Sequence, residues 1–200
     1  MSEHYYSEKS TTISEERDWS FTLRGHLLEF YSDRGVFSKT EVDFGSRLLI
    51  ESFAFSDMDG DILDVGCGYG PIGLSLAKED ESRTVHLIDV NERALLLTEK
   101  NAARNNIHNV IVYQSHCLDN VAKKDFAVIL TNPPIRAGKK TVHTIFEQAE
   151  EHLISGGELW VVIQKKQGAP STIEKLKTLF DAVDIVEKKK GYFIIKAKKV

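Results

Sequence analysis

The chain has 200 residues, of which 42% are hydrophobic and 28% charged. These proportions are typical of a globular domain and exclude a disordered chain or a fibre. No apolar run approaches the roughly 18 residues needed to cross a bilayer, and residues 1–12 are polar, so we expect a cytoplasmic protein without a secretory signal. The two cysteines, Cys67 and Cys117, provide neither a disulfide framework nor a metal-binding spacing, and no metal site is predicted.

The net charge of −4 is unevenly distributed along the chain. Residues 1–160 carry 16 basic and 26 acidic side chains, a balance of −10, whereas residues 161–200 carry 10 and 4, a balance of +6. The total argues against a nucleic-acid partner, but a partner that meets one face responds only to the charge on that face.

Residues 1–14 are expected to form a flexible tail, and residues 15–200 a single domain with an N-terminal hairpin at 15–34 and an α/β core at 61–200. The hairpin comes from apolar runs at 19–23 and 27–31. Later runs rich in β-branched residues predict strands at 62–65, 84–89, 110–114, 126–130, 158–164, 184–187 and 192–197. Helical patterns alternate with these strands, which is typical of a mostly parallel sheet.

Helices are predicted around residues 46–53, from Pro71, at 92–105, at 141–155 and from Ser171. Gly156-Gly157 is expected to end the fourth helix, and Ser171 with Glu174 is expected to form a capping box for the fifth. Only residues 188–191 separate the last two strands. Because a parallel crossover needs about a dozen residues, these strands must form an antiparallel hairpin, which leaves one reversed strand at the end of the sheet.

A glycine-rich turn follows the strand at 62–65 and allows two interpretations. Gly68, Gly70 and Gly73 fit the dinucleotide pattern G-x-G-x-x-G, with Asp89 at the distance of a ribose-binding acid. Alternatively the motif begins at Asp64, followed by alternating glycines. A carboxylate at Asp64 would repel a pyrophosphate and attract an ammonium group, which favours the second interpretation. A tight turn without a ligand is the third possibility.

The second form resembles motif I of the class I S-adenosylmethionine-dependent methyltransferases. The resemblance implies α/β architecture of the Rossmann-like class I methyltransferase fold: a seven-stranded, mostly parallel sheet with the last strand antiparallel, helices on both faces and an N-terminal β-hairpin extension. It implies S-adenosylmethionine as the cofactor and Asp89 as the residue that binds the ribose hydroxyls, although Asp89 could instead be a helix N-cap. His116 stands where the family usually has an acid near the adenine, so adenine recognition stays open. The implied cofactor-binding residues are Asp64, Gly66, Cys67, Gly68, Gly70, Asp89, Val90, His116, Cys117, Asn132, Phe37 and Ser38.

Asn132-Pro133-Pro134-Ile135 follows the strand at 126–130 directly. Two prolines stiffen the chain at a strand end, where ligands bind in open α/β sheets, although the segment could be only a rigid turn. The motif resembles the N-P-P-aromatic motif of methyltransferases that modify planar amino groups, and it implies that these four residues are catalytic. The Asn132 side-chain oxygen and the Pro133 carbonyl could accept both hydrogens of an exocyclic amine. Ile135 departs from the aromatic residue of the motif, so Phe37 or Tyr69 could supply a stacking face instead.

Residues 15–200 also resemble the ribosomal RNA guanine-N2 methyltransferases of the small subunit, and would form a single-domain member of that family. The motifs that carry this resemblance are Gly35-Val36-Phe37-Ser38, Asp43-Phe44-Gly45-Ser46 and Asn132-Pro133-Pro134-Ile135. The resemblance implies ribosomal RNA or a ribosomal subunit as partner. The expected substrate-binding residues are Phe37, Arg136, Lys139, Lys165 and Lys166. Residues 188–190 are also basic and could contact phosphates, but a solvated turn is the favoured alternative for them, because this hairpin could lie at the opposite end of the sheet. Alternatives are methylation of a protein glutamine or a small-molecule amine, and a non-catalytic assembly module. No membrane partner is expected, and the oligomeric state is left open, with a monomer as the favoured alternative.

Overall fold

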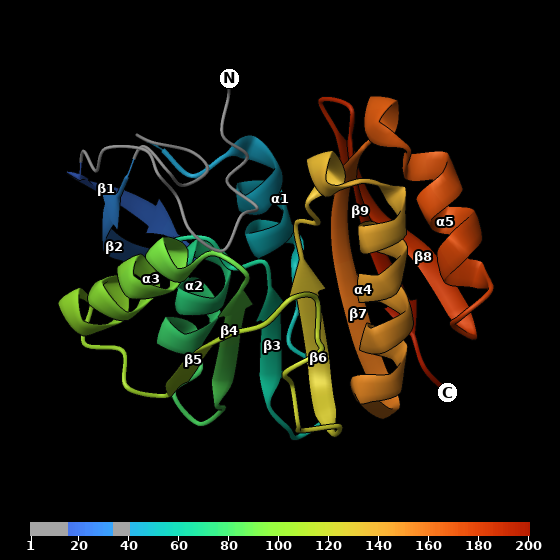
Figure 1. Ribbon diagram of the computed structural model, residues 1–200, viewed down its shortest axis with the longest axis horizontal. Helices are drawn as coiled ribbons and strands as arrows, with labels where there is room; N and C mark the ends of the chain where they lie inside the picture. Colours follow the sequence, from blue (N-terminus) through green and yellow to red (C-terminus); the bar gives the residue numbers. More distant parts are fainter. Residues whose placement is uncertain (1–15, 34–40) are drawn as a thin grey trace.

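The computed structural model describes residues 16–33 and 41–200 (Figure 1). The expected tail at 1–14 and the candidate residues Phe37 and Ser38 lie outside the described residues. Near the N-terminus, β1 (Arg17–Leu23) and β2 (His26–Ser32) pair as the predicted antiparallel hairpin. Among the described helices, none is both long and apolar enough to cross a membrane.

A seven-stranded sheet forms the centre of the molecule, and its topology confirms the predicted fold class (Figure 1). The last strand of the chain runs antiparallel to both of its neighbours, whereas the other four strand pairings of this sheet are parallel. The strands lie in the order β5 (Val110–Gln114), β4 (Val85–Asp89), β3 (Ile62–Val65), β6 (Phe126–Thr131), β7 (Leu153–Gln164), β9 (Tyr192–Lys198) and β8 (Ala182–Lys189).

Helices cover both faces of the sheet, as predicted. Neighbouring residues of β3 belong to different cores, since Ile62 packs in the cluster with α1 (Phe44–Ser52), α2 (Pro71–Glu79) and α3 (Glu92–Arg104). Leu63 packs in the cluster with α4 (Lys139–His152) and α5 (Ala169–Lys177). Burial on both faces explains why the strands lack an alternating polar pattern.

Two predicted helix boundaries are wrong. Helix α4 ends at His152, and Gly156 and Gly157 lie inside β7, where the pairing with β6 shifts register. Gly156 has a φ of +80°, and its N–H donates to the Lys199 carbonyl. This glycine therefore allows an irregularity within a strand and does not end a helix. Helix α5 begins at Ala169 behind Gly168, so no capping box forms, and the Ser171 hydroxyl donates to the Gly168 carbonyl.

The turn between β8 and β9 lies at the carboxyl end of the parallel strands, so the alternative that places residues 188–190 at the opposite end of the sheet is wrong. Gln164, the last residue of β7, pairs with Tyr192, the first residue of β9. The Lys165 N–H also donates to the Gly191 carbonyl at 2.8 Å. Because β9 runs back along β7, the chain reversal at Lys190 and Gly191 must lie at the end where β7 finishes.

Candidate active site

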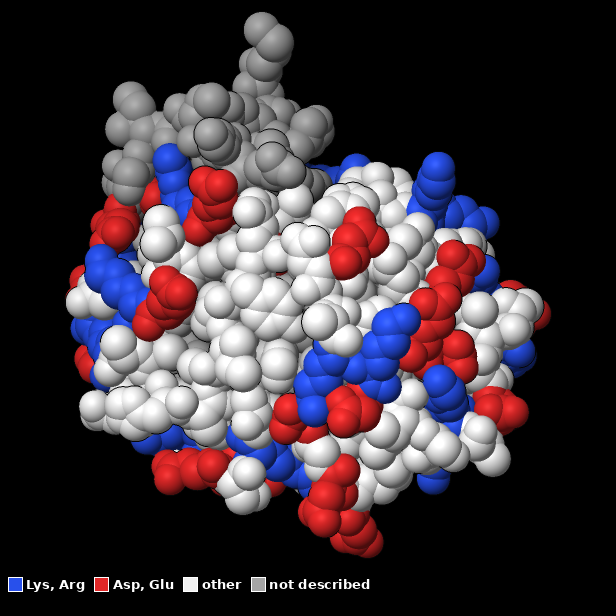
Figure 2. All heavy atoms as spheres, turned by 60° about the horizontal axis from the view of Figure 1, so that its bottom comes forward, with Lys and Arg blue, Asp and Glu red and all other residues white. Residues whose placement is uncertain are grey.

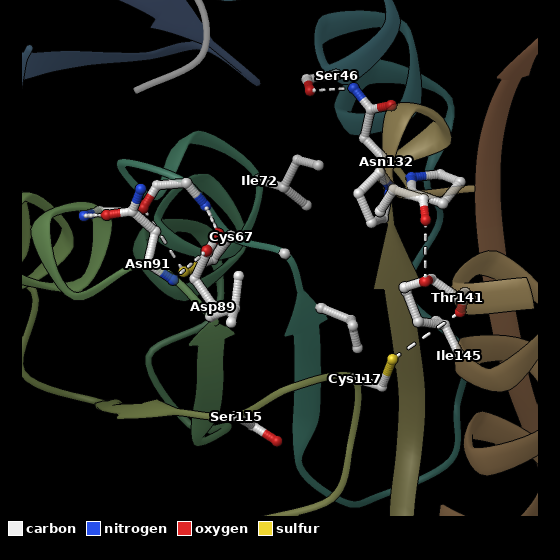
Figure 3. Close-up of a pocket in the computed structure, with 18 of the residues that line it drawn as sticks. Ser46, Cys67, Ile72, Asp89, Asn91, Ser115, Cys117, Asn132, Thr141 and Ile145 are labelled. Atoms are coloured by element: carbon white, nitrogen blue, oxygen red, sulfur yellow. Dashed lines mark hydrogen bonds between the residues drawn. The ribbon is translucent and has the colours of Figure 1, made fainter. Parts of the chain in front are cut away.

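A cavity opens at the carboxyl ends of β3, β4 and β6 (Figure 3). Asp89, Asn91 and Cys67 lie on one side of it, and Asn132 and Ser46 on the other. The carboxyl ends of parallel strands meet there, so loops from distant parts of the sequence share one wall. The lining residues are Asp43, Ser46, Val65, Gly66, Cys67, Gly68, Tyr69, Pro71, Ile72, Asp89, Val90, Asn91, Ala94, Ser115, His116, Cys117, Asn132, Pro133, Pro134, Ala137, Thr141 and Ile145.

The loop after β3 leaves space for a ligand at the cavity wall. Gly66 and Gly68 have φ values of +75° and +59°, and a Cβ built on either would meet no atom within 4 Å. The N–H groups of Gly66 and Cys67 both donate to the Ile88 carbonyl, and the Thr98 hydroxyl donates to the Gly68 carbonyl. These hydrogen bonds fix the loop against β4 and α3. On the cavity side, the absence of side chains at Gly66 and Gly68 leaves space that a ligand can occupy.

Asp89, at the end of β4, lines this cavity with both carboxylate oxygens held by backbone N–H groups. Oδ2 accepts from Gly68 at 2.9 Å and Oδ1 from Asn91 at 2.9 Å. Burial raises the pKa of Asp89, and the hydrogen bonds from these N–H groups lower it. The N-cap of α3 is Asn91, whose side chain accepts from Arg93 and Ala94, so Asp89 is not the helix cap. Each carboxylate oxygen keeps capacity for another donor, which suits a vicinal diol.

Two predicted cofactor-binding residues, Asp64 and Gly70, do not line the cavity. The Asp64 carboxyl is completely buried, and its Oδ2 accepts from the Gly73 N–H at 2.8 Å. Its Oδ1 is buried without a hydrogen-bond partner in the described part of the chain. Burial, opposed by the Gly73 hydrogen bond, raises the pKa of Asp64 to about 7. The structure thus places Asp64 under the glycine loop rather than on its open side.

The Asn132 side chain lines the cavity and has a defined orientation (Figure 3). Its amide nitrogen donates to Ser46 Oγ at 3.0 Å and to Asp43 Oδ1 at 3.3 Å. Asp43 is also the N-cap of α1, where the same oxygen accepts from the Ser46 N–H. Since a carboxylate only accepts, the nitrogen of the amide must face Asp43, and both of its hydrogens are used. Asn132 Oδ1 is left as the available acceptor.

The two prolines fold into a tight turn. Pro134 has φ −74° and ψ 78°, and the Ile135 N–H donates to the Pro133 carbonyl at 2.8 Å, which is the geometry of an inverse γ-turn. One lone pair of the Pro133 carbonyl remains for another donor. Pro133 and Pro134 line the cavity, but Ile135 packs against the core beside α4, so the structure does not bring Ile135 to the site with the other three.

The remaining predicted residues differ in their placement. Val90, His116 and Cys117 line the cavity, and His116 is exposed, with Nδ1 3.2 Å from Asp119. Burial raises the pKa of the Cys117 thiol to about 11 and that of Cys67 well above its usual range, so both thiols are neutral near pH 7. Arg136, Lys139, Lys165 and Lys166 are exposed outside the cavity.

Asp43 and Ser46, which orient Asn132, were not among the predicted site residues. Asp43 and Ser46 have the spacing of an N-cap and its N3 residue, which would have marked the start of α1 at Phe44, but nothing local connects them to Asn132. Tyr69, considered as a stacking face, is buried, and its ring packs edge-on against Trp19 and Phe30. It therefore belongs to the contact between the hairpin and the core.

Comparison with known proteins places this arrangement in a family. Residues 27–196 match the family model described as Methyltransferase small domain. The chain is 65% identical, over the full length of both, to the Bacillus subtilis protein called Uncharacterized protein YbxB. Over 80% of its length it is 34% identical to the Ribosomal RNA small subunit methyltransferase C of Vibrio vulnificus, of which it covers 47%.

Among solved structures, a Thermus thermophilus 16S rRNA N2 G1207 methyltransferase, in complex with AdoMet and guanosine, matches with a TM-score of 0.82 at 23% identity. The match covers 92% of this chain and 51% of that one, and at this identity it shows the shared fold. The chain spans about half the length of the curated ribosomal RNA methyltransferases that it matches.

Proposed function

The chain belongs to the methyltransferase small domain family and is an S-adenosylmethionine-dependent methyltransferase; we propose that its acceptor is the exocyclic N2 of a guanine in ribosomal RNA. The observation that carries this proposal is the Asn132 amide, whose two hydrogens are held by Asp43 and Ser46. Because the amide nitrogen is held, Asn132 Oδ1 is left as a hydrogen-bond acceptor in a side chain that lines the cavity. An exocyclic amine can donate to this oxygen. The related ribosomal RNA methyltransferases favour RNA as the source of that amine.

The cavity fits the proposed cofactor on the residues present. Gly66 and Gly68 leave the wall open where side chains would stand, and the Asp89 carboxylate can accept from the ribose hydroxyls. Val90, Cys67 and Cys117 supply apolar and weakly polar surface around it. When bound, S-adenosylmethionine supplies an electrophilic methyl group for in-line displacement from its sulfonium.

The protein's own contribution is the position of the amine. Asn132 Oδ1 and the remaining lone pair of the Pro133 carbonyl would accept its two hydrogens, which directs the nitrogen lone pair away from both acceptors. Both groups are held before substrate arrives, Asn132 by Asp43 and Ser46, and Pro133 by its γ-turn. Holding the reacting atoms in this way accounts for most of the expected acceleration.

The acceptor can be identified by incubating the purified protein with labelled cofactor and small ribosomal subunits from a strain that lacks it. We expect label in N2-methylguanosine after nucleoside analysis. Label in another nucleoside would contradict the guanine N2 assignment. Label that survives ribonuclease would indicate a protein acceptor, and cofactor binding without any transfer would indicate a non-catalytic assembly module.

Asn132→Ala tests the role of the amide. We expect kcat to fall by about 100- to 1,000-fold, the effect of losing one preorganised polar group in a catalytic site. The dissociation constant for the cofactor, measured by calorimetry, should change by less than about threefold, because Asp89 and the glycine loop are untouched. Asn120→Ala, which alters an exposed asparagine outside the cavity, is the control. Retained turnover in the Asn132 variant would exclude the proposed role.

The cytoplasmic location, the monomeric state and the division into one domain with a tail stay predictions from the sequence. The substrate-binding roles of Arg136, Lys139, Lys165 and Lys166 are part of the proposal, supported by their exposure beside the site.

A further inference from the structure

Basic side chains gather on one half of the carboxyl end of the sheet. They come from the segment after β6, the segment after β7 and the β8–β9 turn, three places that the sheet order β6-β7-β9-β8 brings side by side. All are exposed. We call this group the basic arc, and its members are Arg136, Lys139, Lys140, Lys165, Lys166, Lys188, Lys189 and Lys190.

Within the part of the chain that the structure describes, the members of the basic arc differ from most other cations in having no carboxylate partner. None of them forms a salt bridge with any residue in the described ranges. Many of the other described cations form a salt bridge with a carboxylate, among them Arg24, Lys100, Arg104, Lys123, Lys175 and Lys199. Because a salt bridge neutralises the charges of both partners, the cations of the arc keep their charge available for an anionic partner.

The opposite end of the sheet provides a comparison. Figure 2 turns the lower end of Figure 1 forward, and there blue and red side chains lie interleaved. The net charge of −4 therefore conceals two different surfaces. Within the described ranges, the cluster of eight exposed cations without a salt bridge lies at the end that carries the candidate active site, whereas the opposite end has isolated ones such as Lys124 and Lys198.

The β8–β9 turn is connected rigidly to the site. The Tyr192 ring lies 5.3 Å from the Phe44 ring, between centroids, and Lys190 Nζ lies 5.0 Å above the Phe44 ring. Gly45 permits this approach, since a Cβ there would stand 2.8 Å from Tyr192. Phe44 and Gly45 follow Asp43, the residue that holds the Asn132 amide. The turn and the proposed catalytic residue thus share the first turn of α1 as their support.

We propose that Lys188, Lys189 and Lys190 bind backbone phosphates of the RNA substrate, beyond the nucleotide that enters the cavity. This inference rests on the proposed function and adds the surface that holds the substrate. The turn lies two to three strand positions from β6, which is about 10–14 Å at about 4.8 Å per strand. At about 3.4 Å per nucleotide along a stacked strand, it meets phosphates about three to four nucleotides from the target. Such contacts set affinity and position but carry no sequence information.

The first test measures binding to a fluorescein-labelled, 20-nucleotide single-stranded RNA at several salt concentrations. The triple variant K188Q/K189Q/K190Q should bind on the order of tenfold more weakly than wild type at 0.1 M salt. The slope of log K against log salt should fall by about 2, at about 0.7 for each lost phosphate contact. The matched control is K124Q/K177Q/K198Q, which removes three lysines from the opposite end of the sheet and should leave both values unchanged.

Two results of this experiment would overturn the inference: equal binding by the triple variant and wild type, or an equal loss in the control. Polyglutamate of matched charge is added as competitor. If it displaces the RNA as well as unlabelled RNA does, the turn binds acidic polymers in general and the assignment to RNA backbone is wrong.

The second test separates this inference from the proposed function. With the ribosomal subunits that accept methyl groups from wild type, the triple variant should show a raised KM and an unchanged kcat, and cofactor affinity should not change. A lowered kcat with unchanged KM would overturn the inference. If wild type itself methylates no RNA, the proposed function fails, whereas the binding experiment still decides whether the turn contacts phosphates.

Discussion

Asn132 owes its orientation to two residues that lie 86 and 89 positions earlier in the chain. Ser46 is buried, and its hydroxyl oxygen accepts a hydrogen bond from the Asn132 amide at 3.0 Å, which is shorter than the 3.3 Å bond to Asp43. Asp43 uses one oxygen both to cap α1 and to accept from Asn132. The proposed catalytic acceptor is therefore set by the start of a helix and not by its own loop.

Ser46→Ala tests this positioning. We expect kcat to fall by about tenfold, since one of the two hydrogen bonds that hold the amide is lost, while the cofactor dissociation constant stays unchanged. The same substitution made in the Asn132→Ala background should have no further effect on kcat, because the group that it positions is absent. Ser52→Ala, at the other end of α1, is the control. Additive losses in the double variant would mean that Ser46 acts independently of Asn132.

At the scale of elements, the N-terminal hairpin is attached to the core by side-chain amides of α3. Asn101 accepts from the Tyr31 N–H and donates to the carbonyls of Tyr31 and Tyr69. Asn105, one turn later, accepts from the Glu29 N–H and donates to its carbonyl. These amides replace a missing strand along the outer edge of β2. Asn101 also ties β2 to the glycine loop through Tyr69.

Asn101→Leu should lower the free energy of unfolding by about 2–3 kcal/mol, because it removes three hydrogen bonds to the partly buried backbone of Tyr31 and the buried carbonyl of Tyr69. Asn105→Ala provides a graded comparison and should cost about 1 kcal/mol, since its contacts are more exposed. Urea unfolding followed by circular dichroism measures both. Equal costs for the two variants would contradict the central role of Asn101.

At the scale of the whole molecule, the buried Asp64 should make stability depend on pH. Its folded pKa is about 7, against an ordinary value of 3.8. Between these values the folded protein binds more protons than the unfolded chain, so this carboxyl makes stability fall as pH rises from about 4 to about 7. The slope from one such group is about 1.4 kcal/mol per pH unit within that window.

Asp64→Asn should remove this contribution, because the amide oxygen can still accept from the Gly73 N–H and cannot ionise. Unfolding free energies of variant and wild type, measured from pH 4 to 8, should therefore diverge in favour of the variant as pH rises. Asp57→Asn, at an exposed site, is the control and should parallel wild type. A constant difference between the Asp64 variant and wild type would show that Asp64 does not titrate in this range.

Local signals in the sequence were enough for the elements and for the kind of fold. β-Branched runs marked the strands, the glycine turn after β3 marked a loop that lines the cavity, and the short gap before Tyr192 required a reversed last strand. These features depend on backbone preferences within a few residues, so they can be derived without knowing the rest of the molecule. The error at Gly156 arose because strand pairing overruled the local preference, and the error at Ser171 arose because the helix already begins at Ala169, with Pro170 in its first turn.

The arrangement of the site was decided only by the tertiary structure. The contact of Asn132 with Asp43 and Ser46, the burial of Tyr69 and the position of Asp64 under the loop all join residues that are distant in sequence. The same holds for residues 188–190, because the pairing of Gln164 with Tyr192 determines the end of the sheet at which they lie. Strand order and register come from packing across the whole core, and no local pattern of residues contains them.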